Sequence, residues 1–364
     1  HTGFTGTSLW IDPTTRTYII LLTNSVHPRG KGNVIALRSK IATAVAASLA
    51  LKVSEQAEVR SKSITGYNET QTAARRLAVR NGSVEAGIDV LEAHNFSEIR
   101  AAIGPASSDA QAARKKKIGL LTNQTGVDAQ GRRTIDVLAA APGISLDAIF
   151  SPEHGVTGTL DTTNIGNSKD EATGVPVYSV YGAKEAARRP SLDVLKNLDA
   201  VVIDVQDAGV RFYTYEASLG YFLEAAAQAG IEVFVLDRPN PITGSFVQGP
   251  VSDPGRDSFV NYFPVPSRHG MTMGELARMY NAERGLNAKL TVVAMEGWVR
   301  GDWYDSTGLA WINPSPNLRS VTEAALYPGV GLVEGTNVSV GRGTETPFEW
   351  LGAPGSRAGN WHSI

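Results

Sequence analysis

Between residues 117 and 237 the chain alternates short apolar runs with amphipathic segments, and this alternation limits the fold more than any other feature. The apolar runs are expected to be buried strands, at residues 117–123, 146–150, 199–205 and 231–237. The segments between them repeat apolar residues at helical spacing, at residues 132–141, 191–198 and 212–230. Strands joined by helices favour a Rossmann-like, doubly wound parallel sheet of the α/β class.

The stretches on either side of this region predict further units. Residues 1–51 read as a β-hairpin followed by a helix from Asn33, too little chain to bury a core of its own. Residues 52–86 are polar and read as a linker, and 87–245 are assigned to the Rossmann-like domain. Residues 246–354 are rich in Gly and Pro, with one clear helix at about 273–283, and are predicted to form a smaller, incomplete α+β domain. Residues 355–364 are set apart as a tail.

Composition excludes several classes of function. The 364 residues include no cysteine, which rules out disulfides, thiolate zinc sites and cysteine nucleophiles. A net charge of −2 gives no basic surface for nucleic acid, and no apolar run approaches the ~20 residues of a membrane span. Neither GxGxxG nor GxxxxGK[ST] follows the first strand, so no cofactor is predicted. Oligomeric state is left open.

Polar side chains follow all four predicted strands. In open parallel sheets, ligands bind beyond the carboxyl ends of the strands, so these residues are expected to line a charged cleft. They are Asn123 after the first strand, Glu153 and His154 after the second, Asp204, Gln206, Asp207, Arg211, Tyr213 and Tyr215 after the third, and Asp237, Arg238 and Asn240 after the fourth.

Glu153 is the strongest candidate for a general acid. It follows Pro152 and an apolar strand, where partial desolvation favours the protonated carboxyl group. His154 is adjacent and could carry a proton itself, while a second carboxylate could come from Asp204, Asp207 or Asp237. Paired carboxylates with aromatic neighbours are typical of glycoside hydrolysis. A divalent-metal site is the competing interpretation, although no HExxH spacing supports zinc.

Residues beyond 245 add weaker candidates. Thr272 and Glu275 are spaced as a capping box. Arg268 and His269 precede that helix, whose N-terminus favours anions. The turns and Gly-rich loops at residues 313–317 and 334–344 carry Asn317, Glu334 and Asn337, and could be scaffolding alone.

Eight motifs in order carry a family resemblance: "GIDVLEAHNF", "GLLTNQTGVD", "FSPEHG", "VIDVQDAGVRFYTY", "DRPNPITG", "RHGMTMGELARMYN", "NPSPNL" and "EGTNVSVGRGTETPFEWLGAP". From about Gly87 to Pro354 the chain resembles the NamZ-type exo-β-N-acetylmuramidases, bacterial enzymes that process peptidoglycan. The resemblance implies a Rossmann-like domain beside a smaller one. It also implies an enzyme that releases N-acetylmuramic acid from the non-reducing end of cell-wall fragments. We expect this enzyme to need no metal and to be exported. It implies Glu153 as the acid and a cleft containing Asp204, Asp207, Arg211, Tyr213, Asp237, Arg268, His269 and Asn317.

The substrate's lactyl carboxylate suits a bidentate arginine, and Arg211, Arg238 and Arg268 are the candidates. The stereochemical outcome stays open. A non-catalytic muropeptide-binding module is the alternative from a different functional class.

Both ends of the chain depart from the family pattern. The opening "HTGFTGTSLWIDP" resembles the end of a serine β-lactamase or penicillin-binding-protein-like domain, with HTG in place of KTG and no Ser-x-x-Lys nucleophile. We expect this piece to be an inactive remnant of a fusion. The final "GSRAGNWHSI" does not resemble the family, so the smaller domain is expected to be truncated.

Overall fold

The computed structural model describes residues 8–12, 17–21, 82–102, 115–162 and 165–353. The chain divides into two compact units, residues 1–74 and 75–364. In the first, β1 (Ser8–Asp12) pairs antiparallel with β2 (Thr17–Leu21), which confirms the predicted hairpin. The helix predicted from Asn33 and most of the linker lie outside the described residues. The resemblance of this unit to a β-lactamase stays a prediction.

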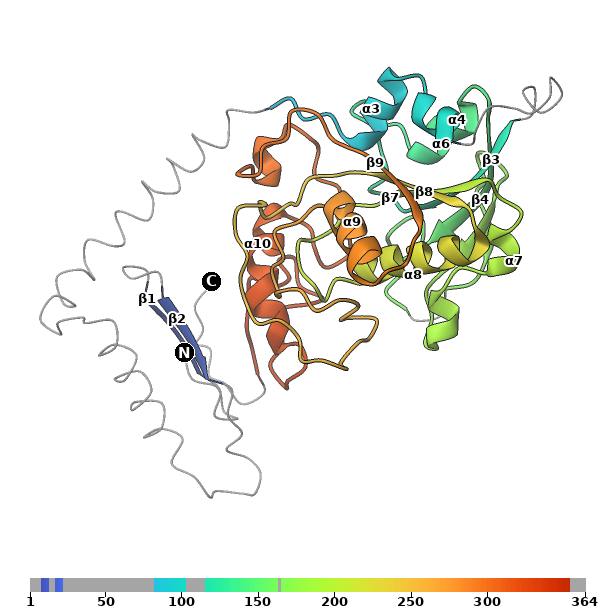
Figure 1. The fold of residues 1–364 in the computed structure, drawn as a ribbon. Coiled ribbons are helices and arrows are strands. Elements are labelled where there is room, and N and C mark those ends of the chain that lie inside the picture. Colours follow the sequence, from blue (N-terminus) through green and yellow to red (C-terminus); the bar gives the residue numbers. More distant parts are fainter. Residues whose placement is uncertain (1–7, 13–16, 22–81, 103–114, 163–164, 354–364) are drawn as a thin grey trace, which may run out of the picture. The chain divides into compact units, whose positions relative to one another are not determined.

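A seven-stranded sheet forms the centre of the second unit (Figure 1). Its spatial order is β5 (Ser168–Lys169), β6 (Pro176–Ser179), β4 (Ile144–Ser151), β3 (Lys116–Thr122), β7 (Ala200–Asp204), β8 (Glu232–Leu236) and β9 (Lys289–Val293). Every pairing is parallel except that of β5 with β6. Numbered along the chain, the six parallel strands follow the order 3-2-1-4-5-6 of Rossmann-like sheets. The predicted α/β class is confirmed.

Helices cover both faces of this sheet (Figure 1). Alternate strand residues point to opposite faces, so Val201 and Ile203 of β7 pack in one core and Val202 in the other. The first core includes residues of α7 (Leu192–Leu195), α8 (Thr214–Ala229) and α9 (Met273–Glu283). The second includes residues of α3 (Gly87–Ala93), α4 (Ser97–Ala102) and α6 (Thr134–Ala140).

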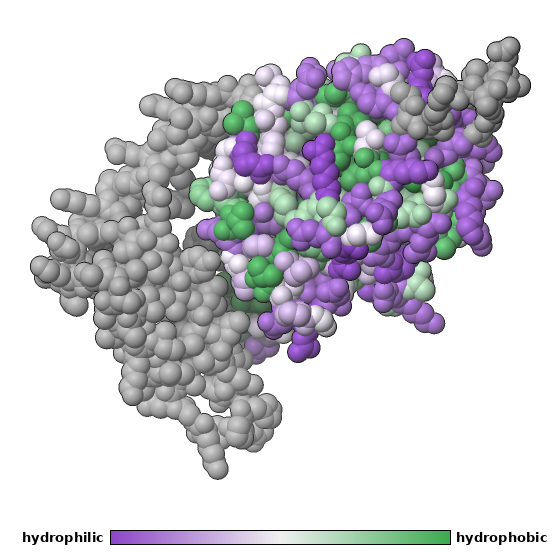
Figure 2. Space-filling model, in the orientation of Figure 1, coloured by the Kyte–Doolittle hydropathy of each residue, from purple (hydrophilic) through white to green (hydrophobic). Residues whose placement is uncertain are grey.

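The sheet extends beyond the boundary that the sequence suggested at residue 245. Strand β9 lies within the stretch assigned to a smaller domain, yet it pairs with β8 along its whole length. Helix α10 (Val321–Val330) and two 3₁₀ turns, Tyr304–Ser306 and Gly331–Val333, lie in the stretch that follows β9. The face of the molecule drawn in Figure 2 is mainly hydrophilic, with small, separate hydrophobic patches. No described helix is long and apolar enough to cross a membrane.

Helix α9 begins at the predicted capping box. The Thr272 hydroxyl accepts a hydrogen bond from the backbone N–H of Glu275 at 3.2 Å, and the Glu275 carboxylate accepts one from the backbone N–H of Thr272 at 3.0 Å. Asp237, at the end of β8, accepts from the Thr272 hydroxyl at 2.7 Å and from the backbone N–H of Gly274 at 2.8 Å. Burial raises the pKa of Asp237 to about 6, although these hydrogen bonds act to lower it. The helix start is therefore tied to the sheet edge that carries the candidate site.

Thr272→Ala is expected to lower the free energy of unfolding by about 1–2 kcal/mol, because it removes the cap and one hydrogen bond to a buried carboxylate. Urea unfolding followed by circular dichroism would measure the change. Thr272→Ser keeps the hydroxyl and should recover most of the loss. Equal stability of the Ala and Ser variants would contradict this account of the helix start.

Candidate active site

The strand order reverses between β3 and β7, and the loops that leave these two strands are joined by hydrogen bonds. The Asn123 side-chain oxygen accepts from the Thr125 hydroxyl at 2.6 Å, and that hydroxyl oxygen accepts from the backbone N–H of Gln206 at 3.0 Å. The Asn123 amide donates to the Tyr215 hydroxyl at 2.7 Å. In sheets of this order, the crevice at the reversal is where ligands bind, and the loop residues at this point are polar and held in place by hydrogen bonds.

Glu153 lies just beyond the end of β4, next to this crevice, and is half-buried. The Tyr181 hydroxyl bonds one carboxylate oxygen and the Thr214 hydroxyl bonds the other, each at 2.6 Å. Hydroxyl groups both donate and accept, so these two contacts can hold the side chain in place whether or not it carries a proton. A general acid must keep its position both before and after it gives up its proton, and these contacts allow that.

His154, adjacent to Glu153, has one ring nitrogen engaged with the backbone. Its ring is buried, and Nδ1 donates to the backbone carbonyl of Leu160 at 2.8 Å. Its backbone has φ of 72°, an uncommon conformation for a residue with a Cβ. These features bend the loop after β4 sharply, which is a structural role for a residue that the sequence suggested as catalytic.

Tyrosine rings connect Glu153 to a second carboxylate, Asp207. The rings of Tyr213 and Tyr215 pack edge to face with centroids 4.7 Å apart, and the ring of Tyr327 from α10 meets that of Tyr213 at 6.4 Å. Burial raises the pKa of Tyr215 and of Tyr327, and the negative charges of Glu153 and Asp207 raise both further. Both carboxylates therefore lie close enough to the same rings for their charges to act on them.

Asp207 is buried, and one of its oxygens is free. Oδ2 accepts from the backbone N–H of Gly209 at 2.7 Å and faces the His269 ring at 3.3 Å. Oδ1 has no hydrogen-bond partner, and neither has Oε1 of Gln206, whose amide nitrogen donates to the Pro239 carbonyl at 2.8 Å. Buried polar atoms are almost always paired, so the unpaired Oδ1 of Asp207 is available to a ligand or a water.

Four predicted site residues are instead used inside the fold. Asp204 and Arg238 form a buried ion pair, with Oδ1–Nε at 2.5 Å and Oδ2–Nη2 at 2.9 Å. Burial alone lowers the pKa of Arg238, but the Asp204 carboxylate outweighs burial and raises it. Asn240 donates to the carbonyl of Met271 at 2.9 Å, and Asp237 caps α9 as described. These contacts join neighbouring strand ends, and they leave these four side chains few free donors or acceptors for a substrate.

Arg211 and Arg268, expected near a substrate carboxylate, bind backbone carbonyls. Arg211 donates to Pro250 at 2.7 Å and also to Val265. Arg268 donates to Gln248 Oε1 at 2.9 Å and to Ile242, and its guanidinium stacks 5.0 Å from the Phe246 ring centroid. Burial lowers the pKa of Arg268 to about 10. Both arginines hold the 242–267 segment against the strand ends.

Arg342 supplies a cation that sequence reasoning missed, because its Gly-rich loop reads as scaffolding. Its guanidinium is 48 % exposed and lies 3.3 Å from the Glu334 carboxylate and 3.4 Å from that of Asp161. The Asn317 amide, oriented with its oxygen toward Arg342, accepts from Nε and Nη2 at 3.3 Å each. Burial and the charge of Glu334 raise the pKa of Tyr327, and the Arg342 charge acts to lower it. Asn337 is exposed nearby.

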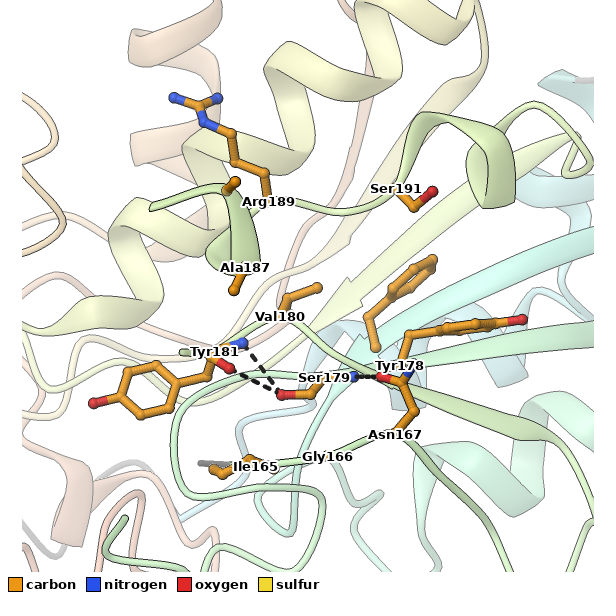
Figure 3. A pocket seen from close by; sticks show the side chains of 12 residues that line it. Ile165, Gly166, Asn167, Tyr178, Ser179, Val180, Tyr181, Ala187, Arg189 and Ser191 are labelled. Atoms are coloured by element: carbon orange, nitrogen blue, oxygen red, sulfur yellow. Dashed lines mark hydrogen bonds between the residues drawn. The ribbon is translucent and has the colours of Figure 1, made fainter. Parts of the chain in front are cut away.

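A cavity of about 380 Å³ is lined in part by Tyr181, the residue whose hydroxyl bonds Glu153 (Figure 3). Its wall includes Asn167, Tyr178, Ser179 and Tyr181 at the carboxyl end of β6. The Ser179 hydroxyl is hydrogen-bonded to the backbone of Tyr181, which fixes the turn that presents the Tyr181 ring. The volume is in the range of small-molecule sites, and Tyr181 borders both the cavity and Glu153.

Glu216, in the first turn of α8, was also missed by sequence reasoning. It lies buried against His269, with Oε1 2.9 Å from Nε2. An acidic residue in a first helical turn is ordinarily explained by the helix dipole, so nothing in the sequence marks it.

Comparison with known proteins matches most of the second unit to one family. The N-terminal family model of exo-β-N-acetylmuramidase NamZ matches residues 118–322, and the C-terminal model matches 325–363, which includes most of the stretch set apart as a tail. The peptidoglycan β-N-acetylmuramidase NamZ of Bacillus subtilis is 48% identical over 240 residues, which are 66% of this chain and 57% of that protein. The chain thus spans less than two thirds of that relative.

Two crystal structures of DUF1343 family proteins from Bacteroides fragilis are similar to this one. The first has a TM-score of 0.66 at 39% identity, covering 76% of this chain and 67% of its own. The second has a TM-score of 0.60 at 34% identity, covering 74% and 67%. Because the N-terminal family model alone matches more than half of its residues, the chain belongs to the NamZ exo-β-N-acetylmuramidase family.

Proposed function

We propose that this chain is a glycosidase that releases N-acetylmuramic acid from the non-reducing end of peptidoglycan fragments, with Glu153 as the general acid. The observation that carries the proposal is the half-buried Glu153 carboxyl group, held by two hydroxyls at 2.6 Å at the mouth of the strand-end crevice. Family membership and the name of the Bacillus subtilis relative support the substrate class.

The two carboxylates divide the work of hydrolysis. Glu153 gives its proton to the glycosidic oxygen as the bond to the sugar breaks, and the departing saccharide leaves as a neutral alcohol. Positive charge then develops on the sugar ring, and the free Oδ1 of Asp207 supplies negative charge to stabilise it. The partly exposed ring of Tyr181, whose hydroxyl bonds Glu153, provides apolar surface for the sugar. Water completes the hydrolysis, and its proton restores Glu153.

Arg342 is proposed to recognise the lactyl carboxylate that distinguishes muramic acid from glucosamine. Its exposed guanidinium can leave the long contacts to Glu334 and Asp161 and form a bidentate pair with a substrate carboxylate. The three arginines predicted from the sequence are each bound within the fold, so none is as free as Arg342 to pair with a substrate carboxylate.

Arg342→Ala is expected to weaken inhibition by N-acetylmuramic acid about 10- to 100-fold, the effect of losing a charge-assisted hydrogen bond. Inhibition by N-acetylglucosamine, which lacks the lactyl group, should hardly change. Competitive inhibition constants measure both. Arg319→Ala, which removes another exposed arginine from the same part of the chain, serves as the control. An equal loss for the two sugars would contradict recognition of the carboxylate.

Turnover of a chromogenic β-N-acetylmuramide by the unmodified chain tests the proposed function. Release of the chromophore is expected, and a chelator in excess should not reduce it, since no step above requires a metal. Affinity for muropeptides without turnover would favour the binding-module alternative. Turnover abolished by the chelator and restored by a divalent cation would favour a metal-dependent hydrolase.

A further inference from the structure

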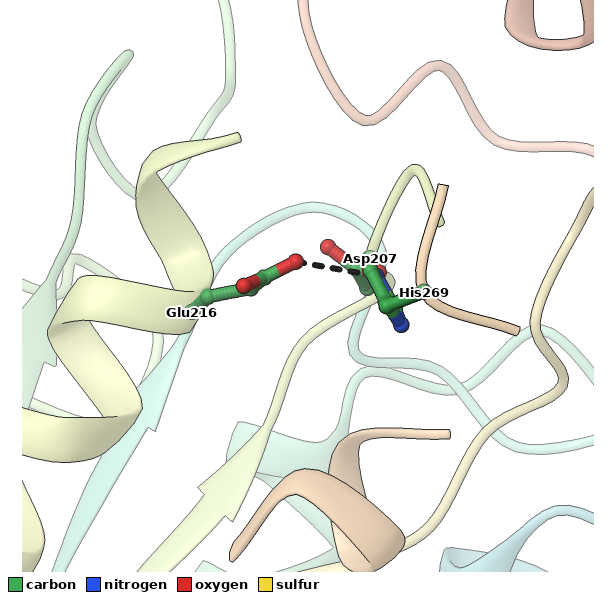
Figure 4. A group of neighbouring side chains, drawn as sticks. All are labelled: Asp207, Glu216 and His269. Atoms are coloured by element: carbon green, nitrogen blue, oxygen red, sulfur yellow. Dashed lines mark ion pairs between the residues drawn. The ribbon is translucent and has the colours of Figure 1, made fainter. Parts of the chain in front are cut away.

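Asp207, Glu216 and His269 meet behind the candidate cleft (Figure 4). They come from the loop after β7, the first turn of α8 and the loop before α9, and all three are at least 97 % buried. His269 Nε2 lies 2.9 Å from Glu216 Oε1 and 3.3 Å from Asp207 Oδ2. On the far side of Glu216, the Tyr280 hydroxyl lies 3.0 Å from Oε2.

The backbone determines which nitrogen of His269 carries the proton. The N–H of Met271 donates to Nδ1 at 3.1 Å, so Nδ1 holds a lone pair. A neutral ring then has its proton on Nε2, where it faces the two carboxyl groups. A metal ion at the same place would need the Nε2 lone pair, and the neutral ring would have to lose its remaining proton. The geometry therefore turns the ring N–H of His269 toward the two carboxyl groups, although Nε2 and Glu216 Oε1 are in close contact without forming a hydrogen bond.

A second proton belongs to Glu216. Burial lowers the pKa of His269, but the charges of Glu216 and Asp207 outweigh burial and raise it, so the three groups together hold one proton more than a neutral ring and two carboxylates would. Nδ1 is already occupied as an acceptor of the Met271 N–H. Burial raises the pKa of Glu216, and its Oε2 has the Tyr280 hydroxyl as a partner for an O–H group. A neutral Glu216 and a neutral His269 leave the single negative charge on Asp207.

We propose that Glu216 and His269 are positioning residues, which hold the Asp207 carboxylate by Oδ2 and keep its Oδ1 free toward the sugar. The inference rests on the proposed function, because it gives Asp207 a part in the hydrolysis. It adds two residues that do not touch the substrate. The charged or titratable groups that face Glu216 are His269, Asp207 and Tyr280. Arg211 is also near enough for Glu216 to raise its pKa, which burial lowers.

Glu216→Ala is expected to lower kcat about 100-fold, the usual effect of misplacing a reacting group by about 1 Å, with a much smaller change in KM. Glu216→Gln should recover most of the activity and follow the pH profile of the unmodified protein, because an amide reproduces the protonated acid. Glu224→Ala is the matched control: Glu224 lies on the same helix and also accepts from a tyrosine, Tyr262 at 2.8 Å. It should affect stability alone.

Two results in this series would overturn the inference. If the Gln variant is as impaired as the Ala variant, a charged Glu216 is required. If the Ala variant keeps full kcat, the group is structural. Should the unmodified protein not turn over the muramide, the proposed function fails by itself, and binding of N-acetylmuramic acid to the same variants replaces turnover as the readout.

Nitrogen-15 NMR of the histidine rings tests the proton arrangement independently of activity. His269 is expected as the Nε2–H tautomer at about pH 6–8, with its signal assigned by its loss in His269→Gln. The tautomer should persist when Zn²⁺ or Mn²⁺ is added. An imidazolium ring at these pH values, or a signal displaced by either metal, would contradict the inference.

Discussion

Glu153→Gln is expected to lower kcat by about 10²- to 10⁴-fold on a β-N-acetylmuramide, the usual contribution of a general acid. Glutamine keeps the shape of the side chain, and its oxygen still accepts from the Tyr181 or Thr214 hydroxyl, so the fold should be unchanged. What it lacks is the proton for the glycosidic oxygen. Steady-state kinetics and a circular dichroism melting curve measure the two effects separately.

The choice of leaving group sharpens this test. A nitrophenolate departs easily without a proton, whereas the saccharide of a natural fragment does not. The loss should therefore be larger on a muramyl disaccharide than on the chromogenic substrate. Glu232→Gln is a matched control, because Glu232 also accepts from a hydroxyl, that of Thr291 at 2.9 Å, but lies at the start of β8. If Glu153→Gln retains turnover within a few-fold, another residue is the acid.

Asp204→Ala is expected to lower the free energy of unfolding by about 3–5 kcal/mol, because it leaves the buried guanidinium of Arg238 without its counter-charge. The hydroxyl of Thr134, which donates to Asp204 at 2.5 Å, loses its acceptor as well. Urea unfolding monitored by tryptophan fluorescence measures the loss. The double variant Asp204→Ala with Arg238→Met should be more stable than Asp204→Ala alone, since no buried charge is left unpaired.

An exposed ion pair provides the comparison. Asp257 is paired with Arg284 at 2.9 Å and is 59 % exposed, so Asp257→Ala should change stability by no more than about 1 kcal/mol. A loss for Asp204→Ala as small as that for Asp257→Ala would show that water reaches the Asp204–Arg238 pair.

The sequence predicted the fold well where strands are buried on both faces. β3, β4, β7 and β8 are nearly continuous apolar runs, and such runs have few alternatives to a central strand. β9 was missed because Lys289 and Thr291 interrupt its pattern at the exposed edge of the sheet. β6 was missed because it is four residues long and begins with Pro176. Strands that are not buried on both faces lack the continuous apolar run that marks a central parallel strand.

The site was predictable at the level of strand exits but not at the level of partners. The sequence gives no reason to distinguish Asp204 from Asp207. In the structure, Asp204 is paired with Arg238, 34 residues away, whereas Asp207 keeps one oxygen without a partner. Only the packing distinguishes them. Glu216 depends in the same way on His269, which approaches it from a distant loop.

The positions of the two proposed catalytic carboxylates follow from the strand order. One follows β4 and the other β7, with β3 between them. Two inter-strand spacings put those strand ends about 9–10 Å apart, a distance set by backbone hydrogen bonds. The loops that carry Arg342 or border the cavity can change in length during evolution without altering the distance between these strand ends. Relatives can therefore diverge in the saccharides they accept while inheriting one unchanged reaction geometry.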